Sequence, residues 1–182
     1  NMDGALRFLT LRGSFRTPAK MVILSVFGGA THPVSSVDLE RLKTIFKEAF
    51  GDTLSFFLKV DRIAKGIPSS FSEMHLAGPK TLGERLVLKD LELLCKISPA
   101  SFYQPNPSQA ELIYQVALDF TEELFLANKI ISILDLFSGI GILGLVFAAR
   151  AKKWKKNTSV TCVELSLHAC MDDEEMIELS VL

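Results

Sequence analysis

The sequence has little cysteine, histidine, tryptophan or tyrosine, and this scarcity excludes several classes of protein. It contains three cysteines, three histidines, one tryptophan and two tyrosines in 182 residues. The cysteines are odd in number and show no Cys-x-x-Cys spacing, which argues against a disulfide framework and for reduced thiols in a cytoplasmic protein. His32, His75 and His168 have no mutual spacing typical of metal ligands, so we expect no metal site.

Long apolar segments are also lacking. No apolar run approaches the roughly 20 residues that a membrane helix requires, so we expect no membrane partner. The hydrophobic fraction is nevertheless 48%, which argues against disorder. The formal net charge of −1 conceals an uneven distribution, because residues 1–110 hold 14 Lys and Arg against 10 Asp and Glu. A basic first half is suited to a polyanionic partner.

Residues 1–97 are predicted to form a central α+β domain with a largely antiparallel sheet. Strands are expected over 5–12, 20–27, 53–60, 71–77 and 85–97, from apolar runs bounded by glycine, proline and polar residues. One helix is expected between the second and third strands, capped by Ser35 or Ser36 and stopped by Gly51. Its apolar residues recur at helical spacing: Leu39, Leu42, Ile45, Phe46 and Phe50.

Residues 98–182 are predicted to form a second domain, because three prolines between 98 and 107 interrupt both helix and strand. Asn106 is suited to an N-cap, with Pro107 opening a helix to about Leu126. We expect that helix to bury Ala110, Ile113, Val116, Ala117 and Phe120. A buried parallel strand (130–135), a glycine loop, a helix to about 151, a strand (159–163) and a last helix follow. This order is the first half of a Rossmann-like α/β sheet.

The most informative segment runs from Asp135 to Gly141, with the sequence Asp-Leu-Phe-Ser-Gly-Ile-Gly. Glycines directly after a buried strand let the backbone turn sharply and approach a ligand closely. The next helix offers free N–H groups, and Asp135 places a negative charge where such folds bind ligands. Glu164 ends the following strand, where a carboxylate accepts both hydroxyls of an adenosine ribose.

Two other interpretations of the loop stay open. The segment from Gly139 to Gly144 also fits Gly-x-Gly-x-x-Gly, the dinucleotide fingerprint, with Glu164 again as the ribose acid. Against an NAD-binding protein, Asp135 interrupts the apolar strand and a long helix precedes the loop. The third interpretation is a plain strand–helix turn with a capping aspartate.

A longer pattern resembles the bacterial ribosomal and transfer RNA uracil-5-methyltransferases, which are class I S-adenosylmethionine-dependent enzymes. It consists of Ser-Pro-Ala-Ser-Phe-Tyr-Gln-Pro-Asn at 98–106, then the glycine loop, then Val163-Glu164. The Phe-x-Gln-x-Asn element is the specific part, since many methyltransferases share the loop alone. The resemblance implies S-adenosylmethionine as cofactor, ribosomal or transfer RNA as partner, and RNA methylation in rRNA processing. It implies six cofactor-binding residues: Gln104, Asp135, Phe137, Gly139, Gly141 and Glu164.

The same resemblance implies that this chain is a truncated middle piece. The family's catalytic cysteine, which adds to the uracil, and its carboxylate base lie beyond an Asp-Pro-Pro motif, and no proline follows Pro107 here. We therefore assign no catalytic residue and expect the chain alone to be inactive. The alternative is a non-catalytic RNA-binding or assembly module with a vestigial cofactor pocket. An apolar strand at 130–134 without its further partners should be covered, either by the sheet of the first half or by a second copy in a homodimer.

Basic residues of the first half are the expected RNA contacts: Arg7, Arg12, Arg62 and Lys65. The run of Arg and Lys at 150–156 is a second candidate for RNA. A solvated helix end whose charges suit the helix dipole explains that run equally well.

Overall fold

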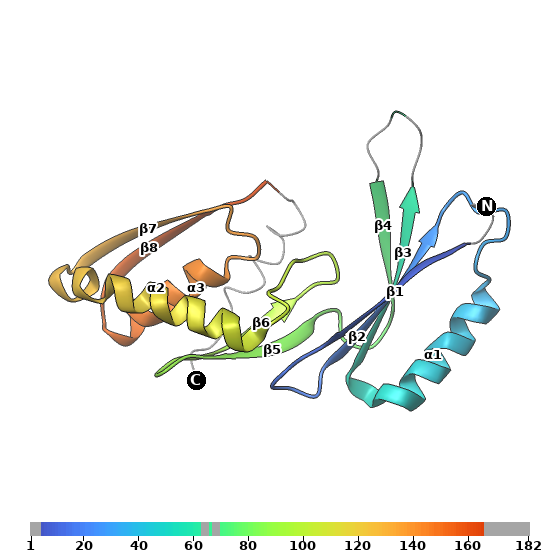
Figure 1. Ribbon diagram of the computed structural model, residues 1–182, viewed down its shortest axis with the longest axis horizontal. Helices are drawn as coiled ribbons and strands as arrows, with labels where there is room; N and C mark the ends of the chain where they lie inside the picture. Colours follow the sequence, from blue (N-terminus) through green and yellow to red (C-terminus); the bar gives the residue numbers. More distant parts are fainter. Residues whose placement is uncertain (1–4, 63–65, 67–69, 166–182) are drawn as a thin grey trace. The chain divides into compact units, whose positions relative to one another are not determined.

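The computed structural model describes residues 5–62, 66 and 70–165, and the chain divides into two compact units between Leu82 and Gly83 (Figure 1). This division comes earlier than the domain boundary expected between residues 97 and 98. The strands between residues 83 and 97 belong to the second unit. Side chains of a helix farther along the chain accept hydrogen bonds from the backbone of this segment. The boundary at 97/98 stays a prediction, and each unit is described by itself.

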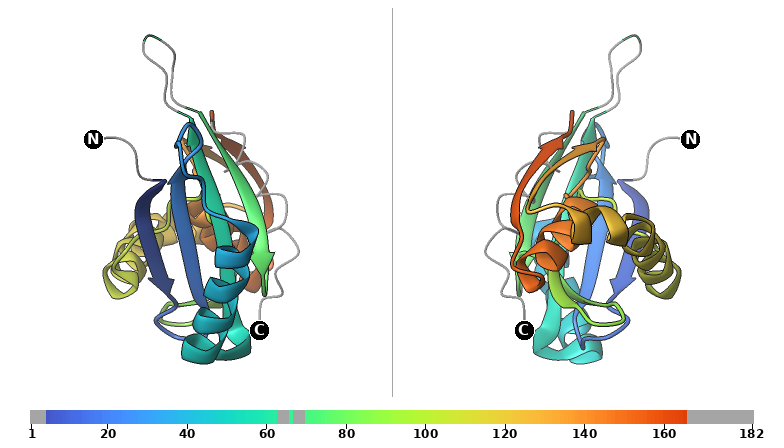
Figure 2. Two further views of the ribbon diagram at one scale, coloured as in Figure 1. Left: turned by 90° about the vertical axis from the view of Figure 1, so that its right-hand side faces the viewer. Right: turned by 90° about the vertical axis from the view of Figure 1, so that its left-hand side faces the viewer.

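The first unit is a mixed sheet of four strands with a helix on one face (Figures 1 and 2). Its strands lie in the order β1 (Leu6–Gly13), β2 (Lys20–Phe27), β3 (Leu54–Arg62) and β4 (Ser70–Ala77). The outer pairings are antiparallel, and β2 and β3 are parallel. A parallel pair needs a crossover, which α1 (Ser36–Phe50) and the 3₁₀ turn η1 (Gly51–Thr53) provide.

Helix α1 begins and ends where the sequence predicts. The Ser35 hydroxyl accepts a hydrogen bond from the Asp38 N–H at 3.1 Å, and Gly51 ends the helix with φ of 74°. The core beneath α1 is built from alternate residues of β2 and β3: Val22, Leu24, Val26, Leu54, Phe56 and Leu58. Phe46 of α1 meets Phe56 edge to face, with ring centroids 5.1 Å apart.

Two short strands, β5 (Leu82–Val87) and β6 (Glu92–Ile97), pair with each other, and all of their residues except Leu82 belong to the second unit. The single strand expected over 85–97 is therefore wrong. The Leu88 N–H donates to the Leu91 carbonyl at 2.8 Å, and this turn splits the apolar run into two strands.

Helix α2 (Pro107–Ala127) starts as predicted, since the Asn106 side chain accepts from the Gln109 N–H. Its expected buried face is wrong in part: Ile113, Val116 and Phe120 are 59%, 50% and 84% exposed. Glu111 and Gln115 are buried instead, because their side-chain oxygens accept from the Val87 and Lys89 N–H groups at 2.9 and 3.1 Å. Satisfying those backbone donors fixes the rotation of the helix.

Strands β7 (Ile130–Leu136) and β8 (Asn157–Val163) are parallel and are joined by α3 (Ile142–Lys153). The prediction of a strand buried on both faces is wrong, because Ile130 and Leu134 are 72% and 62% exposed. Among the described strands β7 pairs with β8 alone, and the cover expected for its apolar residues stays a prediction. Only the alternate residues on the α3 side are shielded. None of the helices described has the length and apolarity to cross a membrane.

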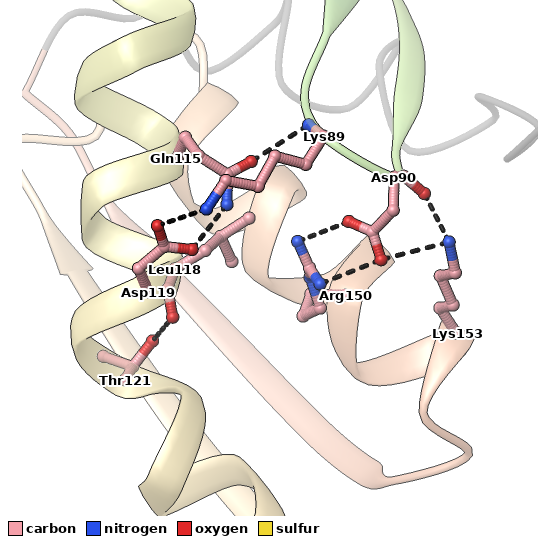
Figure 3. A network of polar contacts seen from close by, with 8 residues as sticks. All are labelled: Lys89, Asp90, Gln115, Leu118, Asp119, Thr121, Arg150 and Lys153. Atoms are coloured by element: carbon pink, nitrogen blue, oxygen red, sulfur yellow. Dashed lines mark hydrogen bonds and ion pairs between the residues drawn. The ribbon is translucent and has the colours of Figure 1, made fainter.

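Charged groups connect the β5–β6 turn to both helices of this unit (Figure 3). Asp90 forms a two-pronged ion pair with Arg150 of α3, at 2.6 and 3.0 Å, and a third contact with Lys153 at 3.1 Å. Lys89 bonds to Asp119 of α2 at 2.8 Å. Since the Arg150 side chain is only 9% exposed, its charge depends on Asp90 for compensation.

We predict that Asp90→Asn lowers the free energy of unfolding by about 2 kcal/mol, because it leaves a buried guanidinium without a counter-charge. Urea unfolding followed by circular dichroism measures the change. The control is Asp52→Asn, which should cost less than about 0.5 kcal/mol because its ion pair with Lys47 is largely exposed to water. Equal losses in the two variants would contradict the structural role of Asp90.

Candidate cofactor site

The loop between β7 and α3 folds as a tight turn. At two of its positions the backbone adopts a conformation that favours glycine. Gly139 and Gly141 have φ of 59° and 71°, in the left-handed region that favours glycine. The Gly141 N–H donates to the Ser138 carbonyl at 2.9 Å, and the Ser138 N–H donates to Val163 of β8 at 3.2 Å. A side chain at Gly139 would point into open space, so the backbone there is accessible to a ligand.

Asp135 is buried and works as a cap for α3. Its Oδ2 atom accepts from the Gly144 N–H at 3.0 Å, in the first turn of the helix. A Cβ at Gly144 would lie 2.9 Å from Val160 and 3.1 Å from Cys162, so glycine lets α3 approach β8 closely. The carboxylate thus satisfies one of the free N–H groups of the helix and positions the loop.

Glu164 joins the loop to the end of β8. Its Oε2 atom accepts from the Gly139 N–H at 2.9 Å, and its Oε1 accepts from the Leu165 N–H at 2.8 Å. A carboxylate oxygen can accept more than one hydrogen bond, and carboxylates are suitable acceptors for hydroxyl groups. The predicted ribose acid and the predicted glycine loop are therefore in direct contact.

Two further residues of the loop, Ser138 and Phe137, have surroundings that are unusual for their side chains. The Ser138 hydroxyl oxygen is buried and has no hydrogen-bond partner among the described residues. Such an orphaned oxygen is suited to a polar group supplied by a ligand. Phe137 is 91% exposed and has φ of 58°, a strained conformation for an aromatic residue. The sequence analysis named Phe137 but assigned no role to Ser138, because the sequence does not reveal whether a hydroxyl in a loop is buried.

A cluster of buried polar side chains adjoins the Phe-x-Gln-x-Asn element. Burial raises the pKa of Cys95 to about 12, with a further contribution from the charge of Glu84. Burial also raises the pKa of Tyr103 and of Tyr114, and the nearby Asp135 carboxylate adds to the effect on Tyr114. These groups stay neutral at physiological pH, so Cys95 lacks the thiolate that a nucleophile needs.

The other predicted site residues are placed as follows. Gln104 is exposed, one residue after Tyr103 and shortly before α2, and no hydrogen bond connects it to the loop in the part of the chain described. Arg7 lies near the carboxyl end of β2, with its guanidinium 4.9 Å from the centre of the Phe27 ring. Arg62 ends β3 and is exposed. Lys65 lies outside the described residues.

Arg12 is half-buried at the opposite end of β1, paired in register with Met21. Burial lowers the pKa of Arg12, and the charge of Glu73 opposes that shift. Three of the basic residues at 150–156 form ion pairs or hydrogen bonds within the second unit. Arg150 and Lys153 hold Asp90, and the Lys156 ammonium donates to the Leu126 carbonyl at 3.1 Å. These contacts favour the helix-end interpretation of that run.

We predict that Phe137→Asn leaves the free energy of unfolding unchanged or raises it by up to about 1 kcal/mol, since asparagine tolerates a positive φ far better. Thermal and urea unfolding measure the effect. Phe102→Asn is the matched control, because Phe102 is 71% exposed and is not among the described residues with positive φ. A loss of more than about 1 kcal/mol at Phe137 alone would mean that its ring stabilises the fold and is not held ready for a ligand.

We compared the sequence of the chain with protein families and with proteins of known sequence. No protein-family profile matches the chain. It is 34% identical to an uncharacterized RNA methyltransferase of Protochlamydia amoebophila, in an alignment that covers 96% of this chain and 40% of the relative. An uncharacterized RNA methyltransferase of Staphylococcus epidermidis is 33% identical over 82% of the chain and 30% of its own length. One of Chlamydia muridarum is 30% identical over 97% and 42%.

These alignments cross both units and include the glycine loop. The chain spans less than half the length of the relatives it matches. Over most of its length, this chain is related to bacterial RNA methyltransferases.

Proposed function

We propose that the chain is a portion of an S-adenosylmethionine-dependent RNA uracil-5-methyltransferase and contains the first half of its cofactor site. The observation that carries the proposal is the bonding of Glu164 to the Gly139 N–H, at 2.9 Å. This bond supports the proposal because the carboxylate proposed as ribose acceptor contacts the glycine turn proposed to border the ligand. Relationship to RNA methyltransferases supports the methyl donor as the ligand.

The residues of the loop fit S-adenosylmethionine. Glu164 would accept the ribose hydroxyls and Phe137 would border the adenosine. The turn at Gly139 and Gly141 would border the ligand, with open space beside Gly139. Asp135 would act on the ligand's positive charge at a distance while it caps α3. Gln104 would contact the cofactor from the segment before α2. The cofactor supplies a methyl group on a positively charged sulfur, which a negatively charged site attracts.

RNA as the substrate rests on the relatives' names, and ribosomal or transfer RNA and uracil C5 rest on the Phe-x-Gln-x-Asn resemblance. We propose that the whole protein acts in the cytoplasm. None of the described cysteines suits the nucleophile, since Cys95 is buried with a raised pKa and Cys162 packs beside Gly144. The 182 residues alone should therefore transfer no methyl group. The exposed apolar residues of β7 remain a candidate homodimer surface.

Two alternatives stay in contention. The first is a non-catalytic RNA-binding module. In support of it, Asp135 and Glu164 hold the loop by hydrogen bonds within the chain, without any ligand. An NAD-binding protein is favoured by Gly144, whose close approach to β8 is the role of the third glycine in the dinucleotide fingerprint. Ligand binding discriminates among all three.

Calorimetric titration with S-adenosylhomocysteine tests the proposal. We expect Glu164→Gln to raise the dissociation constant roughly ten-fold, because it removes the charge that strengthens the ribose hydrogen bonds. Glutamine keeps a carbonyl oxygen for the Gly139 N–H, so the loop should stay closed. Glu48→Gln, on the exposed side of α1, is the control and should leave the constant unchanged.

Tighter binding of NAD than of S-adenosylhomocysteine would overturn the proposal in favour of the dinucleotide protein. Binding of neither ligand would favour the non-catalytic module. Equal affinity of the wild type and Glu164→Gln would remove Glu164 from the ribose site.

A further inference from the structure

The segment between β6 and α2 carries Gln104 and is fixed at both of its ends. At one end the Ser98 and Ser101 hydroxyls lie 2.9 Å apart, and Ser101 is buried. At the other end the Asn106 side chain accepts a hydrogen bond from a backbone N–H of α2 at 3.2 Å. In the part of the chain that the structure describes, the backbone of residues 102–105 forms no hydrogen bond. The position of Gln104 therefore depends on the side chains of the segment itself.

Tyr103 turns its side chain inward next to Gln104. Phe102 and Gln104 are exposed, whereas Tyr103 between them is half-buried. The Tyr103 hydroxyl oxygen is buried and has no hydrogen-bond partner among the described residues. A buried hydroxyl without a partner destabilises the arrangement that holds it. The ring thus anchors the segment, while the hydroxyl remains able to donate a hydrogen bond.

An acceptor of matching chemistry lies in the same interior. Glu84 is only 2% exposed, on the face of β5 that otherwise buries leucines, and its Oε1 atom accepts from the Arg85 N–H at 3.0 Å. Burial raises the pKa of Tyr103 most, and the nearby Cys95 and Glu84 raise it further, so the tyrosine keeps its proton at physiological pH. A buried carboxylate is stabilised by each donor that reaches it. Tyr103 and Glu84 are therefore a donor and an acceptor close to each other.

We propose that Tyr103 is a positioning residue of the cofactor site: when Gln104 contacts the cofactor, the Tyr103 hydroxyl donates to the Glu84 carboxylate and holds the segment in place. The inference rests on the proposed function, because it requires Gln104 to bind S-adenosylmethionine. A hydrogen bond from a hydroxyl to a carboxylate is stronger than a neutral one, especially where water is excluded. It stabilises one position of the segment, so the affinity for the cofactor depends on a group that does not touch it.

Calorimetric titration of Tyr103→Phe with S-adenosylhomocysteine tests this role, because the variant loses the hydroxyl and keeps the ring. We expect the dissociation constant to rise roughly ten-fold, the loss of one hydrogen bond to a charged group. Urea unfolding without the ligand should show unchanged or greater stability, since the hydroxyl that is removed has no partner there. A hydroxyl with a purely structural role would lower both affinity and stability.

Tyr114→Phe is the matched control. Tyr114 is the other tyrosine of the chain, and burial raises its pKa as well. Its hydroxyl is not among the buried atoms without a partner in the described residues, and the proposal gives it no role toward Gln104. The variant should leave the dissociation constant unchanged.

Double-mutant cycles test whether Tyr103 acts through Gln104 and Glu84. Gln104→Ala alone should weaken binding, and adding Tyr103→Phe should then weaken it less than about two-fold further, because the two residues act as one unit. Glu84→Gln keeps a carbonyl oxygen for the Arg85 N–H, and in that background Tyr103→Phe should also have little effect. Additive losses in either cycle would overturn the proposal. If Glu84→Gln does not fold, the cycle with Gln104 decides.

Wild-type affinity in Tyr103→Phe, or an equal loss in Tyr114→Phe, would overturn this inference and leave the proposed function standing. A joint loss of affinity and stability in Tyr103→Phe would identify the hydroxyl as structural and would also overturn it. Absence of S-adenosylhomocysteine binding by the wild type would overturn the proposed function, and this inference with it.

Discussion

Two carboxylates, at the ends of neighbouring parallel strands, hold the loop between β7 and α3 in place. Asp135 accepts from the Gly144 N–H at 3.0 Å and Glu164 accepts from the Gly139 N–H at 2.9 Å. A parallel pair brings the carboxyl ends of its strands to the same edge, so both acids reach one turn. Charge-assisted bonds to backbone N–H groups are about twice as strong as neutral ones, which lets them fix a turn with three residues at positive φ.

The rest of the second unit supports that edge. Glu111 and Gln115 bind the backbone of the β5–β6 turn, and Asp90 in the same turn binds Arg150 of α3. Through these contacts the turn connects α2 to the helix that begins at the loop (Figure 3). The strain at Phe137 and the orphaned hydroxyl of Ser138 are features that a bound ligand would compensate.

Much of this architecture follows from local sequence signals. Ser35, Gly51 and Asn106 mark helix ends because capping is a short-range interaction between a side chain and nearby backbone. The strands were predicted from apolar runs, but a run does not specify which of its faces is covered. Ile130 and Leu134 are accordingly exposed, and the turn within 85–97 was missed.

Tertiary contacts explain the remaining differences. The buried face of α2 was predicted from apolar spacing, whereas Glu111 and Gln115 face inward to satisfy backbone donors distant in sequence. The loop and its two acids were found from strand-end spacing alone. Asp135 caps α3 and Glu164 binds the loop backbone, and both roles depend on distances in the folded chain that spacing in the sequence does not give. The pairing of Arg150 with Asp90 likewise joins residues that no local pattern relates.

The central claim, that this loop is a methyl-donor site, is tested most directly by nuclear magnetic resonance of the ¹⁵N-labelled chain titrated with S-adenosylhomocysteine. If the loop binds the methyl donor, the largest backbone amide shifts fall at Gly139, Gly141 and Gly144, while the Gly51 amide at the end of α1 stays unchanged. Shifts that concentrate outside residues 135–164, or larger shifts of the same glycines with NAD, would contradict it.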